Sequence, residues 1–172
     1  KDITDEANLN SSNFWSTGVA IADVNEDGLM DIYVCGAMHK SNRTNKLYIN
    51  KGYNEEGKPV FTEQAESFGI ADKGNSMGAT FLDYDQDGDL DLYVLNNEQS
   101  ETLPTTYRKK IKDGSAISND RLYQNQGNGT FLDVTIQAGI TIEGFGLSVT
   151  PLDVNKDNYV DLYITNDYLT ND

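Results

Sequence analysis

The sequence predicts an all-β fold, built from the four-stranded antiparallel meander blades of a β-propeller, with about two and a half blades in the chain. The first observation is an acidic motif, Asp-x-[Asp/Asn]-x-Asp-[Gly/Asn]-x-x-Asp, which begins at residues 23, 83 and 153. The second is the short apolar, β-branched and aromatic segment that follows each copy at once. The third is the recurrence of two further blocks between the copies. Repeats at such regular spacing indicate a repeat architecture.

Each repeat unit predicts the order strand, acidic loop, strand, connection, strand, turn, strand. The block Asn45–Asn50 matches Asp120–Asn125, and Phe61–Ile70 matches Phe131–Ile140. β-Branched and aromatic residues favour strands in these blocks. The predicted strands of the first unit are Gly18–Ala22, Asp31–Gly36, Lys46–Asn50 and Val60–Glu63. Those of the second are Met77–Leu82, Leu90–Asn96, Arg121–Asn125 and Thr130–Val134, and the third unit offers Leu147–Leu152 and Val160–Thr165.

The phase of the repeats predicts one repeat array over residues 1–172, divided into blades. Its expected parts are the tail of a preceding blade at 1–10, blade one at 14–70, blade two at 75–140 with an insert at 99–119, and the first half of blade three at 145–172. Closing a propeller takes at least about four blades. We therefore expect a piece of a longer protein or a partial array, whose open blade edges favour self-association.

The acidic loops have the spacing of ligands for a hard cation. Calcium takes six to eight oxygens at about 2.3–2.6 Å. Loop positions one, three, five and nine offer side-chain oxygens, and position seven offers a backbone carbonyl. The predicted ligands are Asp23, Asn25, Asp27, Leu29 and Asp31 in loop one, Asp83, Asp85, Asp87, Asp89 and Asp91 in loop two, and Asp153, Asn155, Asp157, Tyr159 and Asp161 in loop three. Up to three calcium ions are expected.

Two alternatives compete with this interpretation. An EF-hand needs a glutamate at position twelve and helices on both sides, but Val34, Val94 and Ile164 stand there, within strand-like segments. The other alternative is an acidic surface turn that binds nothing. Position six is glycine in loops one and two and Asn158 in loop three. Asparagine accepts left-handed backbone angles better than most residues, so we expect loop three to keep its shape.

Charge and composition exclude several classes of function. The formal net charge is −15, from 28 acidic and 13 basic residues, which disfavours nucleic acid and anionic membranes as partners. No run of about 18 apolar residues occurs, so no membrane insertion is expected. Millimolar calcium would saturate even weak sites. This favours an extracellular, cell-surface or periplasmic location. Cys35 is the sole cysteine and is expected to be a buried, inert thiol.

The sequence does not predict an enzyme, and no catalytic residue or cofactor-binding motif is assigned. His39 is the sole histidine, which excludes zinc sites built from several histidines. The abundant carboxylates fall at calcium-ligand spacing. The insert at 99–119 carries a basic stretch that is either an interaction loop or a solvated connection.

These blocks resemble the FG-GAP/VCBS repeat family, known from integrin α-subunit propellers, and most of all its cartilage-acidic-protein-like branch. The resemblance rests on the three acidic loops followed by Ile/Leu-Tyr and on the Leu47-Tyr48 and Leu122-Tyr123 blocks. It implies a β-propeller, usually seven-bladed, with calcium in the first hairpin of some blades. It also implies adhesion, ligand binding or scaffolding, with a protein or glycan as partner.

Three hypotheses of function stay open at this point. The first is a calcium-stabilised propeller segment in an extracytoplasmic binding or adhesion protein, with structural calcium. The second is a carbohydrate-binding or accessory module of a polysaccharide-processing enzyme. The third is a purely structural repeat segment.

Overall fold

The described residues fold into two four-stranded antiparallel sheets and one two-stranded sheet. The structure, a computed structural model, describes residues 2–9, 13–37, 42–97 and 109–167. The first sheet has the order β1 (Ser16–Ala22), β2 (Asp31–Gly36), β3 (Lys46–Tyr53), β4 (Pro59–Glu63). The second has β5 (Ser76–Leu82), β6 (Asp91–Asn96), β7 (Arg121–Asn125), β8 (Phe131–Asp133), and the third pairs β9 (Gly146–Leu152) with β10 (Asp161–Asn166). The predicted meander of propeller blades is therefore confirmed.

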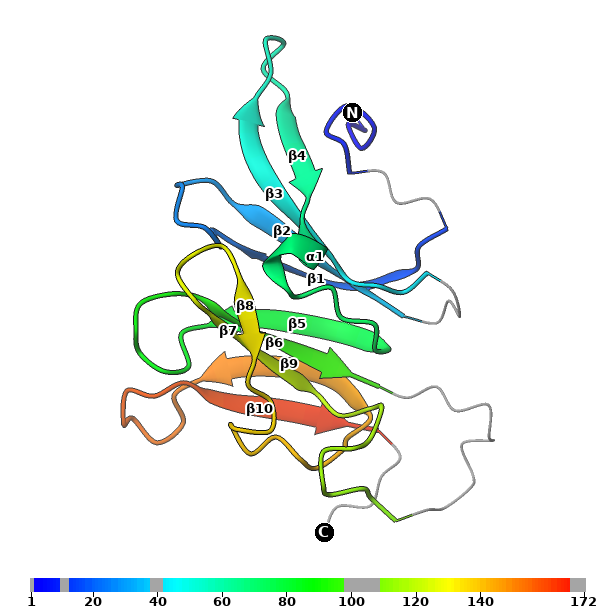
Figure 1. Cartoon of the computed structure of the whole chain (residues 1–172), viewed down its shortest axis with the longest axis vertical. Helices are drawn as coiled ribbons and strands as arrows, with labels where there is room; N and C mark the ends of the chain where they lie inside the picture. The colour runs from blue at the N-terminus through cyan, green and yellow to red at the C-terminus, as the bar shows by residue number, and fades with distance from the viewer. Residues whose placement is uncertain (1, 10–12, 38–41, 98–108, 168–172) are drawn as a thin grey trace.

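The three sheets stack on one another and present their acidic loops on the same side of the stack. Figure 1 shows the β1–β2, β5–β6 and β9–β10 connections together along the left of the molecule. Each connection closes the same hairpin register, with Ala22 opposite Asp31, Leu82 opposite Asp91, and Leu152 opposite Asp161. The last pair of each ladder thus places position nine of the loop directly at the mouth of its second strand.

Two apolar cores hold the stack together. The first lies between the first two sheets and includes Tyr33, Leu47 and Leu92. The second joins the second and third sheets, where Tyr93 and Leu95 are buried against partly buried residues of β9 and β10. Residues of β6 such as Leu92 and Leu95 are fully buried on both of its faces. This is why the β6 sequence lacks polar alternation.

A tyrosine marks the same face of each sheet. Tyr33 and Tyr93 occupy equivalent places after their loops, and their exposed fractions are 0% and 2%. Tyr163 holds that place in β10 and is 65% exposed. Among the described residues, the first two sheets bury this face against a following sheet, and the third does not.

The N-terminal residues cover the opposite face of the first sheet. Ala7 is buried with Tyr48 and Phe61, and Ile3 and Leu9 pack against this cluster. The backbone N–H of Phe61 donates to the carbonyl of Ala7 at 3.0 Å. Residues 2–9 thus lie against the first sheet.

The strand bounds differ from the predicted ones by a few residues. The β3–β4 hairpin continues past Asn50, because Tyr53 pairs with Pro59 after a register shift. β8 is shorter than predicted, although the N–H of Val134 still donates to the carbonyl of Leu122 at 2.9 Å. A short helix, α1 (Ala65–Phe68), was not predicted; it ends at Gly69, whose φ of 80° is left-handed.

Some sequence-based expectations concern single residues and connections. Cys35 is buried, as expected, and burial raises the pKa of its thiol to about 12. Residues 99–108 of the insert and His39 lie outside the described residues. The rest of the insert packs on the chain after β8, where the N–H of Gly114 donates to the carbonyl of Thr141 at 2.8 Å.

Candidate metal centre

Left-handed residues shape all three acidic loops. Position six has a φ of 85° at Gly28, 98° at Gly88 and 71° at Asn158. Asn158 therefore takes the backbone angle expected of it. The sequence did not reveal a second left-handed position, position four, where φ is 58° at Glu26, 64° at Gln86 and 63° at Lys156. This conformation costs a residue with a Cβ roughly 1–2 kcal/mol, so other contacts must hold the loop in place.

The carboxylate at position one closes the loop on itself. In loop one, Asp23 accepts the backbone N–H groups of Asp27 and Gly28 at 3.0 and 2.8 Å. Asp153 accepts the N–H groups of the corresponding residues of loop three. In loop two, Asp83 Oδ2 accepts the N–H of Gly88 at 3.2 Å. Its Oδ1 atom is buried and has no hydrogen-bond partner in the described part of the chain.

The carboxylate at position nine joins the loop to the sheet. Asp91 is fully buried, and its two oxygens accept the N–H groups of Tyr84 and Asn125 at 2.9 and 2.8 Å. Asp31 makes the same pair of contacts in loop one, to Val24 at 3.0 Å and Asn50 at 2.7 Å. One side chain therefore ties the start of each of these loops to the third strand of its sheet.

Burial makes these two carboxylates unusual. Removal from water raises the pKa of Asp91 to about 6, against the lowering effect of its two backbone hydrogen bonds. The pKa of Asp31 is also raised, with burial as the main cause. Nearby carboxylates of the same loop add to both shifts. A buried carboxylate close to others is an environment that a cation would relieve.

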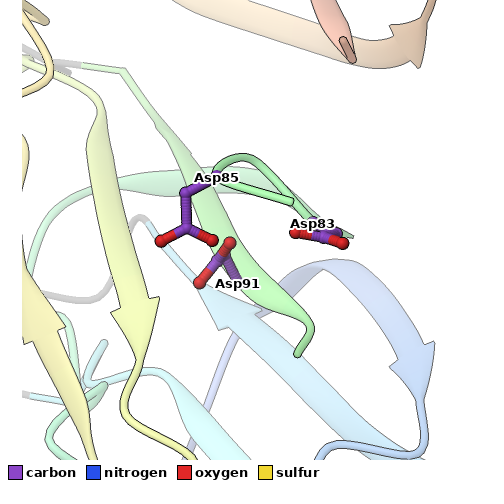
Figure 2. A group of neighbouring side chains, drawn as sticks. All are labelled: Asp83, Asp85 and Asp91. Atoms are coloured by element: carbon purple, nitrogen blue, oxygen red, sulfur yellow. The ribbon is translucent and has the colours of Figure 1, made fainter. Parts of the chain in front are cut away.

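Loop two brings three carboxylates together. Ligand oxygens of Asp83, Asp85 and Asp91 lie within 4.8 Å of one another. Figure 2 shows the carboxylates of Asp85 and Asp91 facing each other, with Asp83 beside them. Carboxylate oxygens are the ligands that a hard cation such as calcium prefers. One of these oxygens, Asp83 Oδ1, has no hydrogen-bond partner among the described residues and is therefore free to bind a cation. The described residues contain no second group of three His, Cys, Asp or Glu side chains whose ligand atoms lie this close together.

The remaining predicted ligands are arranged differently. Asp87 does not belong to this group; its Oδ1 accepts the N–H of Asp89 at 2.9 Å. Loops one and three have an asparagine at position three. Asn25 donates to Asp27 at 3.1 Å, and Asn155 donates to Asp157 at 2.9 Å. Position seven was predicted to contribute only its backbone carbonyl, at Leu29, Asp89 and Tyr159.

Several residues around loop two could not be recognised from the sequence. Gln124 Nε2 on β7 donates to Asp85 Oδ2 at 2.6 Å. The neighbouring Asn125 supplies the N–H to Asp91 described above, and its side-chain amide donates to the carbonyl of Leu90 at 3.2 Å. The repeated asparagine that ends the Leu-Tyr-x-Asn blocks, at Asn50 and Asn125, was the available signal.

Neighbouring loops also contact one another. Gln86 of loop two donates from Nε2 to the carbonyl of Asn158 in loop three at 2.7 Å. The side-chain amide of Asn125 lies 3.4 Å from the carbonyl of Val24 in loop one. Loops two and three are thus in direct contact, and the end of β7 links loop one to the second sheet.

Comparison with known proteins relates these features to a repeat family. The family model described as "FG-GAP-like repeat" matches residues 23–94 and 113–164, which together are more than half of the chain. Mouse cartilage acidic protein 1 is 27% identical over 154 residues, covering 87% of this chain and 22% of the mouse protein. The human protein of the same name is 26% identical over 155 residues, covering 87% of this chain and 21% of its own length. The chain spans about a fifth of the length of these relatives.

Proposed function

Because this chain belongs to the FG-GAP-like repeat family, we propose that it is a calcium-binding β-propeller segment of an extracytoplasmic protein, with calcium in a structural role. The observation that supports this most is the convergence of Asp83, Asp85 and Asp91 in loop two. The proposed ligands are the fifteen loop residues predicted from the sequence. A bound calcium ion would supply positive charge and oxygen coordination within each loop.

The protein's own residues prepare the loops for such an ion. Asp31 and Asp91 hold the start of a loop against the third strand of the sheet. The left-handed residues at positions four and six turn the loop backbone around the carboxylates. The cation would reduce repulsion among carboxylates and fix a hairpin that already has its shape, so we propose a clip rather than a sensor.

The relatives favour a non-catalytic, extracellular role. Both matched relatives carry the name cartilage acidic protein 1, and FG-GAP-like repeats cover most of this chain. In the described residues, no helix is long and apolar enough to cross a membrane. We propose that the segment contributes to adhesion, ligand binding or scaffolding through a protein or glycan partner.

Calorimetric titration tests the proposal directly. When calcium is added to the metal-free chain, each chain should bind up to three calcium ions. Asp87→Ala removes an exposed loop-two ligand and should reduce that number by one or weaken one site. Glu55→Ala is the matched control, because it removes one exposed negative charge at the β3–β4 hairpin, outside the loops. If millimolar calcium gives no binding heat and no calcium is retained on dialysis, the proposal is wrong.

We also propose that the third sheet mediates self-association of this chain. It offers both the unpaired edge of β10 and the exposed face that carries Tyr163. β10 pairs only with β9 in the described part of the chain, whereas β2 and β6 each pair with a third strand. Unpaired strand edges invite pairing with another chain. The third sheet also exposes Tyr163 by 65% and, in its acidic loop, Val154 by 66%. In the first two sheets, the face equivalent to that of Tyr163 packs on a following sheet.

The complementary surface lies at the other end of the stack. Val19 and Ile21 of β1 are 59% and 61% exposed. Their counterparts in β5, Ala79 and Phe81, pack against the core shared with the first sheet. The third sheet of one copy would therefore pack on β1 of a second copy, in a head-to-tail contact.

Analytical ultracentrifugation across a concentration series measures this association. The wild-type chain should form concentration-dependent oligomers, and Tyr163→Asp should shift it toward monomer. Tyr53→Asp is the control, because Tyr53 is 74% exposed on the β3–β4 hairpin, away from both surfaces. A wild-type chain that stays monomeric at high concentration would contradict the proposal.

A further inference from the structure

Loop two differs from the other loops in how position three is held. In loops one and three this position is asparagine, whose side-chain amide donates to the aspartate at position five. In these two loops the hydrogen bond to the aspartate at position five therefore holds the asparagine side chain in place within its own loop. The side chain of Asp85 has no N–H group and, when ionised, no O–H group to donate. It needs a donor from elsewhere to be held in the same way.

Gln124 provides that donor from another strand. Its Nε2 atom lies 2.6 Å from Asp85 Oδ2, and it reaches across from β7, the third strand of the sheet. The repeated blocks Leu47-Tyr48-Ile-Asn50 and Leu122-Tyr123-Gln-Asn125 place Gln124 at the position of Ile49 in β3. Ile49 is fully buried and offers no polar group. In the part of the chain that the structure describes, loop one thus has no equivalent of this contact.

The hydrogen bond acts where three carboxylates meet. Asp85 is exposed, and repulsion from Asp83 and Asp91 would turn its side chain toward solvent. The neutral Gln124 amide opposes this movement without adding charge. The position-one carboxylate is also arranged differently here. In the described ranges Asp83 Oδ1 has no hydrogen-bond partner, whereas Asp23 Oδ1 accepts an N–H of its own loop at 3.0 Å. Among the described residues, loop two is therefore the loop in which three carboxylates each bring an oxygen within 4.8 Å of the others.

We propose that Gln124 is a positioning residue that orients Asp85 and makes loop two the tightest of the three cation sites. The inference rests on the proposed calcium function, which it extends by ranking the sites and naming the residue behind the ranking. Hydrogen-bonding partners of metal ligands commonly contribute 10–100-fold to metal affinity. A contribution of about that size is expected from Gln124.

The test compares Gln124→Met with the parent chain in a background that isolates loop two. Asp27→Ala and Asp157→Ala each remove one exposed ligand, from loop one and loop three, so the tightest calcium binding that remains in the titration is assigned to loop two. Gln124→Met keeps the length of the side chain and removes the donor. We expect calcium binding at loop two to weaken about 10–100-fold, while the melting temperature in EDTA stays unchanged. In the wild-type background, loop two should fill first.

Gln126→Met is the matched control. Gln126 is the same residue type two positions along, and its Nε2 donates to the backbone carbonyls of Gln124 and Asn125 rather than to a loop carboxylate. It should leave calcium affinity unchanged.

The outcomes of this test separate the two proposals. Calcium binding that is equally tight with and without Gln124 overturns the inference and leaves the calcium function standing. A loss of affinity that accompanies an equal loss of metal-free stability also overturns it, because it indicates a structural role. Absence of any binding in the isolating background overturns the inference, and absence of binding in the wild-type chain as well overturns both.

Discussion

Replacing Asp91 with alanine is expected to destabilise the metal-free chain by about 2–4 kcal/mol. The carboxylate accepts the backbone N–H groups of Tyr84 and Asn125 in a fully buried position. Each buried donor left without a partner costs about 1–3 kcal/mol. Part of this loss is offset, because the variant no longer buries a carboxylate whose pKa burial raises to about 6. The balance remains clearly unfavourable.

Urea unfolding in EDTA measures this effect without any contribution from calcium. Asp87→Ala is the control, since Asp87 is also a predicted ligand of loop two but accepts only the N–H of Asp89 within an exposed part of the loop. Surface changes of this kind stay within about 0.5 kcal/mol. If both variants lose the same stability, Asp91 does not tie the loop to the sheet as described.

The order of strands and loops could be predicted from the sequence because it is written in local patterns. The three acidic loops repeat, and the segments after Asp31, Asp91 and Asp161 are rich in β-branched and aromatic residues. The missing glutamate at position twelve, together with the strand-like flanking segments, distinguishes these loops from EF-hands. Asn158 in the left-handed position of loop three was likewise predictable from its side chain.

The surroundings of the site could not be predicted, because they depend on residues far apart in the chain. Gln124 meets Asp85 across 39 positions, and Gln86 meets Asn158 across 72. Such pairs are set by how strands pair and sheets stack, which no local pattern specifies. The same reason explains why Asp31 and Asp91, predicted simply as ligands, also serve as buried acceptors for backbone N–H groups of the third strand.

Withdrawal of calcium is expected to have the largest effect on the whole chain. An ion that binds only the folded state at a hundredfold excess over its Kd stabilises that state by about 2.7 kcal/mol. For a domain of this size, about 1 kcal/mol shifts the Tm by roughly 2–4 °C. Each occupied loop should therefore raise the Tm by roughly 5–11 °C, and the effects of separate loops should add.

Thermal unfolding with millimolar calcium and with EDTA therefore tests most directly whether the loops are structural calcium clips. A triple variant, Asp23→Ala, Asp83→Ala and Asp153→Ala, serves as the control, because it removes position one from every loop. If the loops are structural calcium clips, calcium should raise the Tm of the wild-type chain strongly and that of the triple variant little. Identical melting curves for the wild-type chain with calcium and with EDTA would contradict this role.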